Sequence, residues 1–260
     1  MITAGIDMGA KNIKAVVLKD GKTAGKSLIL GGFNTKESAS TALNAALKEA
    51  GIARKDVEGL VATGIGKKEV YRTPPIDAGE QVSEVAAAAR GAVALYPSAR
   101  TVIDVGAEEG RVARFDEKGT VKDFAINERC AAGAGTFVEA MSRALEVKVE
   151  EMGPLSLKSE KSVPMNAQCA VFAESEVVSL IHAKTSKPDI ARAIHDAIAT
   201  RIASMVRRVG VEKDVVLIGG VARNAGFVNS LQRELGVDLI VLPDPEYVSA
   251  LGAALIPLKK

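Results

Sequence analysis

An approximate internal repeat constrains the fold of this chain more than any other feature. Near the N-terminus, Gly5-Ile6-Asp7-Met8-Gly9-Ala10 is followed by an apolar run and a charged turn at 19–22. About a hundred residues later, Val102-Ile103-Asp104-Val105-Gly106-Ala107 is followed by a similar run and a charged turn at 116–120. Each copy has the pattern of a strand, a tight glycine turn, a second strand and a charged turn into a third strand. The repeat therefore predicts two duplicated lobes that each open with a β-meander.

After each meander, the spacing of apolar residues changes from alternate positions to every third or fourth position, which is typical of helices. Strands that alternate with helices indicate α/β lobes with mostly parallel sheets. We expect residues 1–98 to form the first lobe, residues 99–245 to form the second, and residues 246–260 to pack back onto the first lobe as a helix. Helices are expected at 38–50, 80–95, 131–145, 170–183, 188–209, from 224 and at 247–255, and further strands at 59–64, 214–218 and 238–242.

The composition excludes some classes of partner. Hydrophobic residues make up 47% of the 260 residues and charged residues 25%, which is ordinary for a soluble globular protein. Aromatic residues are scarce at 3%, and the 34 basic and 32 acidic residues are well mixed, so we expect no nucleic-acid partner and no binding to anionic membranes. No apolar run reaches the ~20 residues of a membrane span, and the N-terminal segment lacks the pattern of a signal peptide. With only two cysteines, the expected location is the reducing cytoplasm.

Two Asp-x-Gly turns are candidate phosphate-binding elements. In the first, backbone N–H groups at the Gly9 turn can point at phosphate oxygens, Asp7 can hold the hydration shell of Mg²⁺, and Lys14 adds a positive charge. Such a turn alone is more often an ordinary hairpin. A second copy at Asp104-x-Gly106 favours two hairpins that clasp one phosphate chain between the lobes.

A third candidate element follows the apolar strand at 214–218, where Gly219-Gly220 precedes a helix cap at Asn224. The glycines leave a close backbone surface on which adenine or ribose could lie, although an ordinary turn between strand and helix is an equal alternative. The patterns of a P-loop and of a Rossmann dinucleotide site are absent from the sequence. The prediction of a nucleotide site therefore rests on the two hairpins and this turn together.

Other polar residues are open to more than one interpretation. Lys67 and Lys68 could contact phosphate, but a solvated turn is favoured, and Glu84 could lie at the nucleotide or on the surface. His182 and His195 are not expected to bind metal, because no carboxylate lies at ligand spacing from either.

The two cysteines, Cys130 and Cys169, each lie where a helix is expected to begin. The positive end of a helix dipole favours a thiolate and helps to offset the charge of a cluster. A cubane iron–sulfur cluster takes four thiolates, so two chains that face each other could complete a set. Two small buried apolar residues are the alternative interpretation.

Three segments are the most specific parts of a resemblance to a known family: Asn127-Glu128-Arg129-Cys130-Ala131-Ala132-Gly133-Ala134-Gly135, Cys169-Ala170-Val171-Phe172-Ala173-Glu174-Ser175-Glu176, and Gly219-Gly220-Val221-Ala222-Arg223-Asn224. The chain resembles the small ATPases that activate 2-hydroxyacyl-CoA dehydratases and that form the ATPase subunits of benzoyl-CoA reductases. These proteins belong to the acetate kinase/actin/hsp70/hexokinase superfamily. The resemblance covers nearly the whole chain. It implies an α/β fold of two duplicated actin/hexokinase-like (ribonuclease H-like) lobes with a nucleotide cleft between them.

The resemblance also implies an ATPase coupled to electron transfer. ATP and Mg²⁺ bind, and one [4Fe-4S] cluster is shared between two homologous ATPase subunits, identical or not, with Cys130 and Cys169 as the ligands of each. Ferredoxin or flavodoxin donates the electron, which passes to larger acyl-CoA-reducing subunits. The residues expected to be catalytic are Asp7, Asp104 and Glu108. The residues expected to bind the cofactor are Gly9, Ala10, Lys11, Lys14, Gly106, Ala107, Gly133, Gly135, Gly219, Gly220 and Asn224.

Two departures from the activator pattern affect the expected function. Where activators have Asp-x-Gly-Ser-Thr, this chain has Asp7-Met8-Gly9-Ala10-Lys11, and where they have Asp-x-Gly-Gly-Gln-Asp, it has Asp104-Val105-Gly106-Ala107-Glu108-Glu109. The added acidic side chains would repel a γ-phosphate unless Mg²⁺ or Lys11 intervenes.

Both departures resemble the smaller ATPase subunit of benzoyl-CoA reductase, which is the function we expect first. The first alternative is a homodimeric activator of a 2-hydroxyacyl-CoA dehydratase. The others are a metal-free small-metabolite kinase of the same superfamily and a non-catalytic partner that binds ATP without turnover.

Overall fold

The computed structural model of the chain describes residues 1–127, 135–165 and 170–259. The chain divides into two compact units. Unit 1 comprises Met1–Val102, Ala113–Asp123 and Leu242–Lys260, and unit 2 comprises Ile103–Val112 and Phe124–Val241.

The first sheet belongs to unit 1 and is mixed. Its strands are β1 (Ile2–Met8), β2 (Asn12–Lys19), β3 (Lys22–Leu30), β4 (Gly59–Thr63) and β5 (Glu80–Gln81), in the order β3-β2-β1-β4-β5. The meander pairs β1, β2 and β3 antiparallel, whereas β4 runs parallel to β1 and β5 parallel to β4. The expectation of a mostly parallel sheet is therefore wrong for this unit, because the meander itself supplies the antiparallel half.

The second sheet repeats the first. Its strands are β6 (Thr101–Val105), β7 (Gly110–Phe115), β8 (Val121–Ile126), β9 (Val215–Ile218) and β10 (Ile240–Val241), in the order β10-β9-β6-β7-β8. Read from the third strand of each meander, the order is β3-β2-β1-β4-β5 in the first sheet and β8-β7-β6-β9-β10 in the second. The duplication that the sequence repeat predicts is thus present in the strand order.

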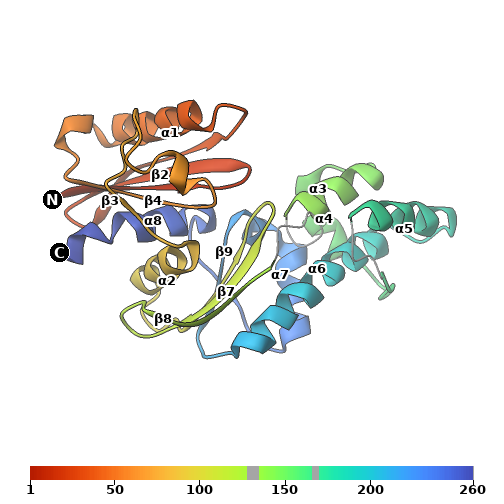
Figure 1. Ribbon diagram of the computed structural model, residues 1–260. Coiled ribbons are helices and arrows are strands. Elements are labelled where there is room, and N and C mark those ends of the chain that lie inside the picture. Colours follow the sequence, from red (N-terminus) through yellow and green to blue (C-terminus); the bar gives the residue numbers. More distant parts are fainter. Residues whose placement is uncertain (128–134, 166–169, 260) are drawn as a thin grey trace. The chain divides into compact units, whose positions relative to one another are not determined.

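Helices cover both faces of the first sheet, as Figure 1 shows: α1 (Thr35–Ala50) lies on one face and α8 (Val248–Ala254) on the other. Strand alternation produces this arrangement, because Ala15 and Val17 pack in the α1 core whereas Val16 and Leu18 pack against α8. The helix α2 (Glu84–Leu95) contacts α8. It begins after the expected position, because Ser83 caps it and residues 80–81 form β5.

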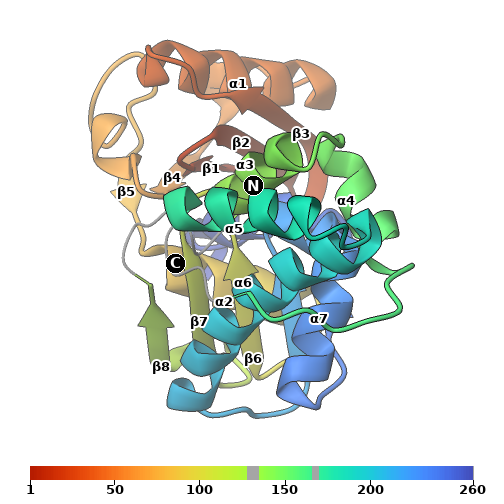
Figure 2. The same ribbon diagram turned by 90° about the vertical axis from the view of Figure 1, so that its right-hand side faces the viewer.

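The core of unit 2 is built on its longest described helix, α6 (Lys187–Val209). The other helices in the described part of this unit are α3 (Gly135–Ala144), α4 (Val149–Ser156), α5 (Ala170–His182) and α7 (Ala225–Leu235). Ile190, Ile194, Ile198 and Ile202 of α6 are fully buried, and α4 and α7 both contact this helix. The helix α4, which contains Pro154, was not expected from the sequence. In Figure 2, α5 faces the viewer.

Candidate functional site

In unit 1, the first Asp-x-Gly hairpin brings a carboxylate and an amine together. The antiparallel register of β1 and β2 places Asp7 opposite Lys14, and Lys14 Nζ donates a hydrogen bond to Asp7 Oδ2 at 3.1 Å. Both side chains are mostly buried, at 13% exposed for Asp7 and 16% for Lys14. A Cβ atom at Gly9 would lie 2.9 Å from Lys14 Nζ, and Ala10 and Lys11 are exposed at the tip of the turn. The hairpin thus presents an ion pair at its base and an accessible backbone at its tip.

A second ion pair lies where β4 ends, in the same unit. Lys67 Nζ donates to Glu84 Oε1 at 2.9 Å, and the two side chains are 21% and 17% exposed. Lys67 also approaches the carbonyl of Gly64, at 3.4 Å. The favoured expectation of a solvated turn is therefore wrong for Lys67, although Lys68 is exposed. The turn sequence did not show which acid would lie opposite the lysine, because α2 supplies that acid from a distant part of the chain.

In unit 2, the second hairpin contains a charged cluster that was not identified from the sequence. Arg111 donates to Glu109 Oε2 at 2.6 Å and to Asp104 Oδ2 at 3.4 Å. The side chains of Arg111, Glu109 and Asp104 are 12%, 11% and 11% exposed. Because Glu109 is paired with a guanidinium, the repulsion of phosphate that two added acids would cause is partly offset. Glu108, next to it, is half-buried.

Two of the other expected residues of unit 2, Gly135 and Gly219, lie against this hairpin. The N–H group of Gly135, the first residue of α3, donates to the carbonyl of Gly106 at 2.9 Å. Thr136 donates to the carbonyl of Ala107 from its N–H at 2.9 Å and from its hydroxyl at 2.8 Å. A Cβ atom at Gly219 would lie 2.6 Å from Asp104 Oδ1. One at Gly220 would meet no described atom within 4 Å, so its backbone borders open space.

The two units build their aspartate sites in the same way. In each, a cation seven residues after the aspartate pairs with it: Lys14 with Asp7, and Arg111 with Asp104. In each, a glycine with a positive φ follows the neighbouring strand, Gly64 at 88° and Gly219 at 87°. A Cβ atom at either glycine would lie 2.6 Å from the Oδ1 atom of its aspartate. The duplication therefore extends from the strand order to the contacts of individual side chains.

Asn224 is held by interactions within the protein. Its Oδ1 atom accepts a hydrogen bond from the N–H group of Phe227 at 3.1 Å and so caps α7. Its amide nitrogen lies 2.9 Å from Nε2 of His195, which is completely buried. Burial lowers the pKa of His195 to about 4, so the ring is neutral at pH 7 and its Nε2 atom accepts from the amide. Asn224 therefore fixes the turn that contains Gly219 and Gly220, and it has one amide N–H left to donate.

The residues expected to hold a cluster, Cys130 and Cys169, lie outside the described residues, as does Gly133. Within the described ranges, no group of three or more histidine, cysteine or acidic side chains is arranged to hold a metal ion. Whether a [4Fe-4S] cluster suits this chain is therefore judged from the two thiols in the sequence and from α5, the described helix that follows Cys169. Cys169 directly precedes α5, whose side chains Phe172, Val178 and Ile181 are 73%, 42% and 41% exposed.

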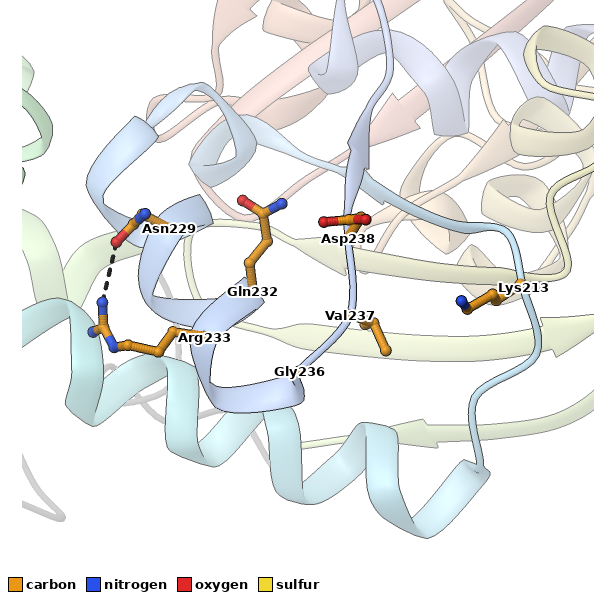
Figure 3. Close-up of a pocket in the computed structure, with 7 residues that line it drawn as sticks. All are labelled: Lys213, Asn229, Gln232, Arg233, Gly236, Val237 and Asp238. Atoms are coloured by element: carbon orange, nitrogen blue, oxygen red, sulfur yellow. Dashed lines mark hydrogen bonds between the residues drawn. The ribbon is translucent and has the colours of Figure 1, made fainter.

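A surface hollow of about 570 Å³ lies elsewhere in unit 2. Its lining residues are Lys213, Asn229, Gln232, Arg233, Gly236, Val237 and Asp238, and Figure 3 shows Arg233 bonded to Asn229. Lys213 precedes β9, whereas Gly219 and Gly220 follow it, so the hollow and the glycine turn are at opposite ends of this strand.

None of the helices in the described ranges is long and apolar enough to cross a membrane.

Comparisons with known proteins identify relatives of the chain. The BadF/BadG/BcrA/BcrD ATPase family matches residues 4–257. The activator of lactoyl-CoA dehydratase from Anaerotignum propionicum is 40% identical, over 98% of this chain and 96% of that protein. A benzoyl-CoA reductase subunit from Thauera aromatica is 34% identical, over 98% of this chain and 92% of that protein. The structure of the 2-hydroxyisocaproyl-CoA dehydratase activator from Clostridium difficile with bound ADPNP matches with a TM-score of 0.91 at 38% identity, covering 100% of this chain and 95% of that one.

These findings confirm the expected family resemblance and fold class. A ROK hexokinase from Thermus thermophilus, at 20% identity and a TM-score of 0.54, shows a likeness of fold alone. Of the two electron-transfer functions expected from the sequence, the comparisons favour the alternative, because the identity to a dehydratase activator exceeds the identity to the reductase protein.

Proposed function

The chain belongs to the BadF/BadG/BcrA/BcrD ATPase family, and we propose that it is the ATP-dependent activator of a 2-hydroxyacyl-CoA dehydratase. The observation that carries this proposal is the 40% identity to the activator of lactoyl-CoA dehydratase over nearly the whole of both chains, against 34% to the benzoyl-CoA reductase protein. The related activator structure with bound ADPNP supports ATP as the ligand.

In unit 2, we propose that the phosphates and Mg²⁺ of the nucleotide bind at the Asp104 hairpin and the Gly219–Gly220 turn. The side chain of Asp104 lies against the backbone of Gly219, and the backbone of Gly220 borders open space. Mg²⁺ is usually bound through one or two carboxylates and the phosphates while it keeps several waters, so Asp104 can hold its hydration shell. Asp104, Glu109 and Arg111 together carry a net charge of −1, which favours a bound cation.

Hydrolysis then depends on charges that are already in place before the nucleotide binds. Arg111 holds Glu109, so Glu108 is the acid of this hairpin that we propose orients the attacking water. Fixed dipoles and charges that match the developing charge of a transition state are usually the largest catalytic contribution, and phosphoryl transfer relies on them.

In unit 1, we propose that the Asp7 hairpin contacts phosphate through the backbone of Gly9 and Ala10 and through the amine of Lys11. Lys14 holds the Asp7 carboxylate in place through their ion pair at 3.1 Å. Lys11 supplies a charge that the activators' Ser-Thr pair lacks, and it compensates for the two hydroxyl donors that are missing here.

We further propose that two copies of this chain share one [4Fe-4S] cluster through Cys130 and Cys169 of each. Such a cluster takes four thiolates and, when bound, supplies one electron at low potential. The exposed apolar side chains Phe172, Val178 and Ile181 of α5, the helix that follows Cys169, are consistent with a surface that a second copy covers. Ferredoxin or flavodoxin would reduce the pair of chains, and the dehydratase would accept the electron.

The test is anaerobic reconstitution of the protein, followed by an assay with purified 2-hydroxyacyl-CoA dehydratases. The expected result is that dehydration of the hydroxyacyl-CoA begins only when ATP, a reductant and this protein are all present. Stoichiometric co-purification with larger subunits that reduce benzoyl-CoA, without activation of any dehydratase, would contradict the proposal in favour of a reductase component. A colourless protein that phosphorylates a small metabolite would favour a kinase.

A further inference from the structure

Asn224 connects the Gly219–Gly220 turn to two helices of unit 2. Its amide donates to His195 of α6, and its Oδ1 atom lies so near α4 that a Cβ at Gly153 would be 2.7 Å away. Only the short 3₁₀ turn Gly220–Arg223 separates Asn224 from Gly219. Any restraint on this turn therefore acts directly on a side chain that α4 and α6 both contact.

The same two helices hold the segment Ser159–Lys161, here called the 159 loop. On the side of α6, Asp189 Oδ1 accepts hydrogen bonds from the Ser159 hydroxyl, the Glu160 N–H and the Lys161 N–H at 2.9, 3.0 and 2.9 Å. On the other side, α4 ends at Ser156, three residues before the loop begins. Asn224 thus contacts both of the elements that fix this loop.

The helix α6 is suited to connect these two points. His195 and Asp189 are six residues apart, which is about 9 Å along a helix. All but one of the residues from Asp189 to His195 are buried, and the helix is continuous from Lys187 to Val209. A closely packed element of this kind moves as a unit, because the interior around it cannot deform continuously.

We propose that Asn224, held by His195, couples occupancy of the Gly219–Gly220 turn to the 159 loop through α6 and α4. The inference rests on the proposed function, since it takes this turn to be the part of unit 2 that binds the nucleotide. Lys161 lies eight residues before Cys169, so the loop leads to an expected cluster ligand. His195 acts here as a positioning residue, because it contacts Asn224 and not the nucleotide.

Hydrogen–deuterium exchange of the full-length chain, with and without Mg²⁺-ADP, tests the coupling without any cluster being loaded. Backbone amides of the 159 loop should exchange at least about fivefold more slowly when ADP is bound, the lower end of usual coupling between sites. His195→Leu, which removes the acceptor, should still bind ADP but lose this protection. His195→Gln, which can accept from the amide again, should restore it.

Two further variants distinguish coupling from a general loss of stability. Ile202→Val removes a buried methyl group from α6 two turns beyond His195 and should leave the protection unchanged. Asn224→Ser retains a residue that can cap α7 but is too short to reach His195, so it should also lose the protection of the 159 loop. It therefore tests the coupling independently if His195→Leu fails to fold.

The inference is overturned if the wild-type protein binds ADP while the 159 loop exchanges at the same rate. Protection in Asn224→Ser equal to that of the wild type would overturn it as well. Failure of the wild-type protein to bind ADP would instead count against the proposed function, and the inference would fail with it.

Discussion

Arg111 determines the charge balance of the second hairpin at the scale of single residues. It contacts two carboxylates, those of Asp104 and Glu109, and all three side chains are nearly buried. Removing one partner of a buried ion pair leaves an uncompensated charge, which is more costly than losing the whole pair. The sequence shows a basic residue here, but only the paired strands bring it to Asp104.

Replacement of Arg111 should therefore destabilise the protein. We expect Arg111→Ala to lower the free energy of unfolding by roughly 3 kcal/mol, and Arg111→Lys to cost less because an amine can still contact one carboxylate. Urea denaturation measures both. Lys122→Ala is the matched control on the same meander, since its pair with Asp116 is more exposed and should contribute less than about 1 kcal/mol. Equal losses of unfolding free energy in Arg111→Ala and in the control would refute this account of the charged side chains at the second hairpin.

Asp104 is expected to act in ATP turnover and not in the binding of iron. Asp104→Asn retains the shape of the side chain but removes the charge that holds hydrated Mg²⁺, so turnover should fall by on the order of 100-fold. Iron content should be unchanged. A steady-state ATPase assay with a parallel iron determination checks this, and undiminished turnover would remove Asp104 from the site.

His195 should make stability depend on pH. Its pKa is about 4 in the folded protein, against 6.5 for an ordinary histidine, because burial disfavours the charged ring. The unfolded chain therefore binds a proton first as the pH falls from 6.5 to 4, and stability should decrease over that range by roughly 3 kcal/mol. His195→Gln should remove this contribution. Unfolding free energies at pH 7 and pH 4.5 measure it, and an identical pH dependence in the variant would contradict the assignment.

At the scale of elements, the internal repeat predicts much of the structure. The two meanders and the later strands appear in the same order in both sheets, and α6 and β4 lie close to their expected ranges. The cation partners of the two aspartates were not recognised as a pair, although Lys14 and Arg111 both lie seven residues after an aspartate. That shared spacing was the available signal.

What the sequence could not predict depends on contacts between distant segments. The pair of Lys67 and Glu84 forms only after α2 packs beside the turn at 64–67, and the contact of Asn224 with His195 requires α6 and α7 to lie together. The start of α2 was misplaced because residues 80–81 pair with β4 and the helix cannot begin before them. Local propensity carries no information about such pairings.

The crossing of α2 and α8 gives a test at this scale. A Cβ atom at Gly252 would lie 1.9 Å from the carbonyl oxygen of Ala87, so Gly252→Ala should push the two helices apart and cost roughly 1–3 kcal/mol. Thermal unfolding measures the effect. Gly79→Ala is the matched control, because a Cβ there meets no described atom within 4 Å. If both variants unfold at the wild-type temperature, the close approach of the helices is wrong.

At the scale of the whole molecule, the account requires two chains. One chain has two thiols, and four thiolates hold a cubane cluster. Cys130→Ser and Cys169→Ser should each abolish iron binding and weaken the association of the two chains, while nucleotide binding in each is retained. Equilibrium binding of a fluorescent ATP analogue provides the control. A variant that keeps its full iron content would show that its cysteine is not a ligand.

The most direct measurement is an iron and subunit count on the untagged native protein, purified without oxygen. Native mass spectrometry with chemical iron analysis should find two identical chains and four irons in one particle, with four equivalents of sulfide. A single chain without iron, with both thiols free to react, would contradict the central claim that two copies of this ATPase hold one cluster between them.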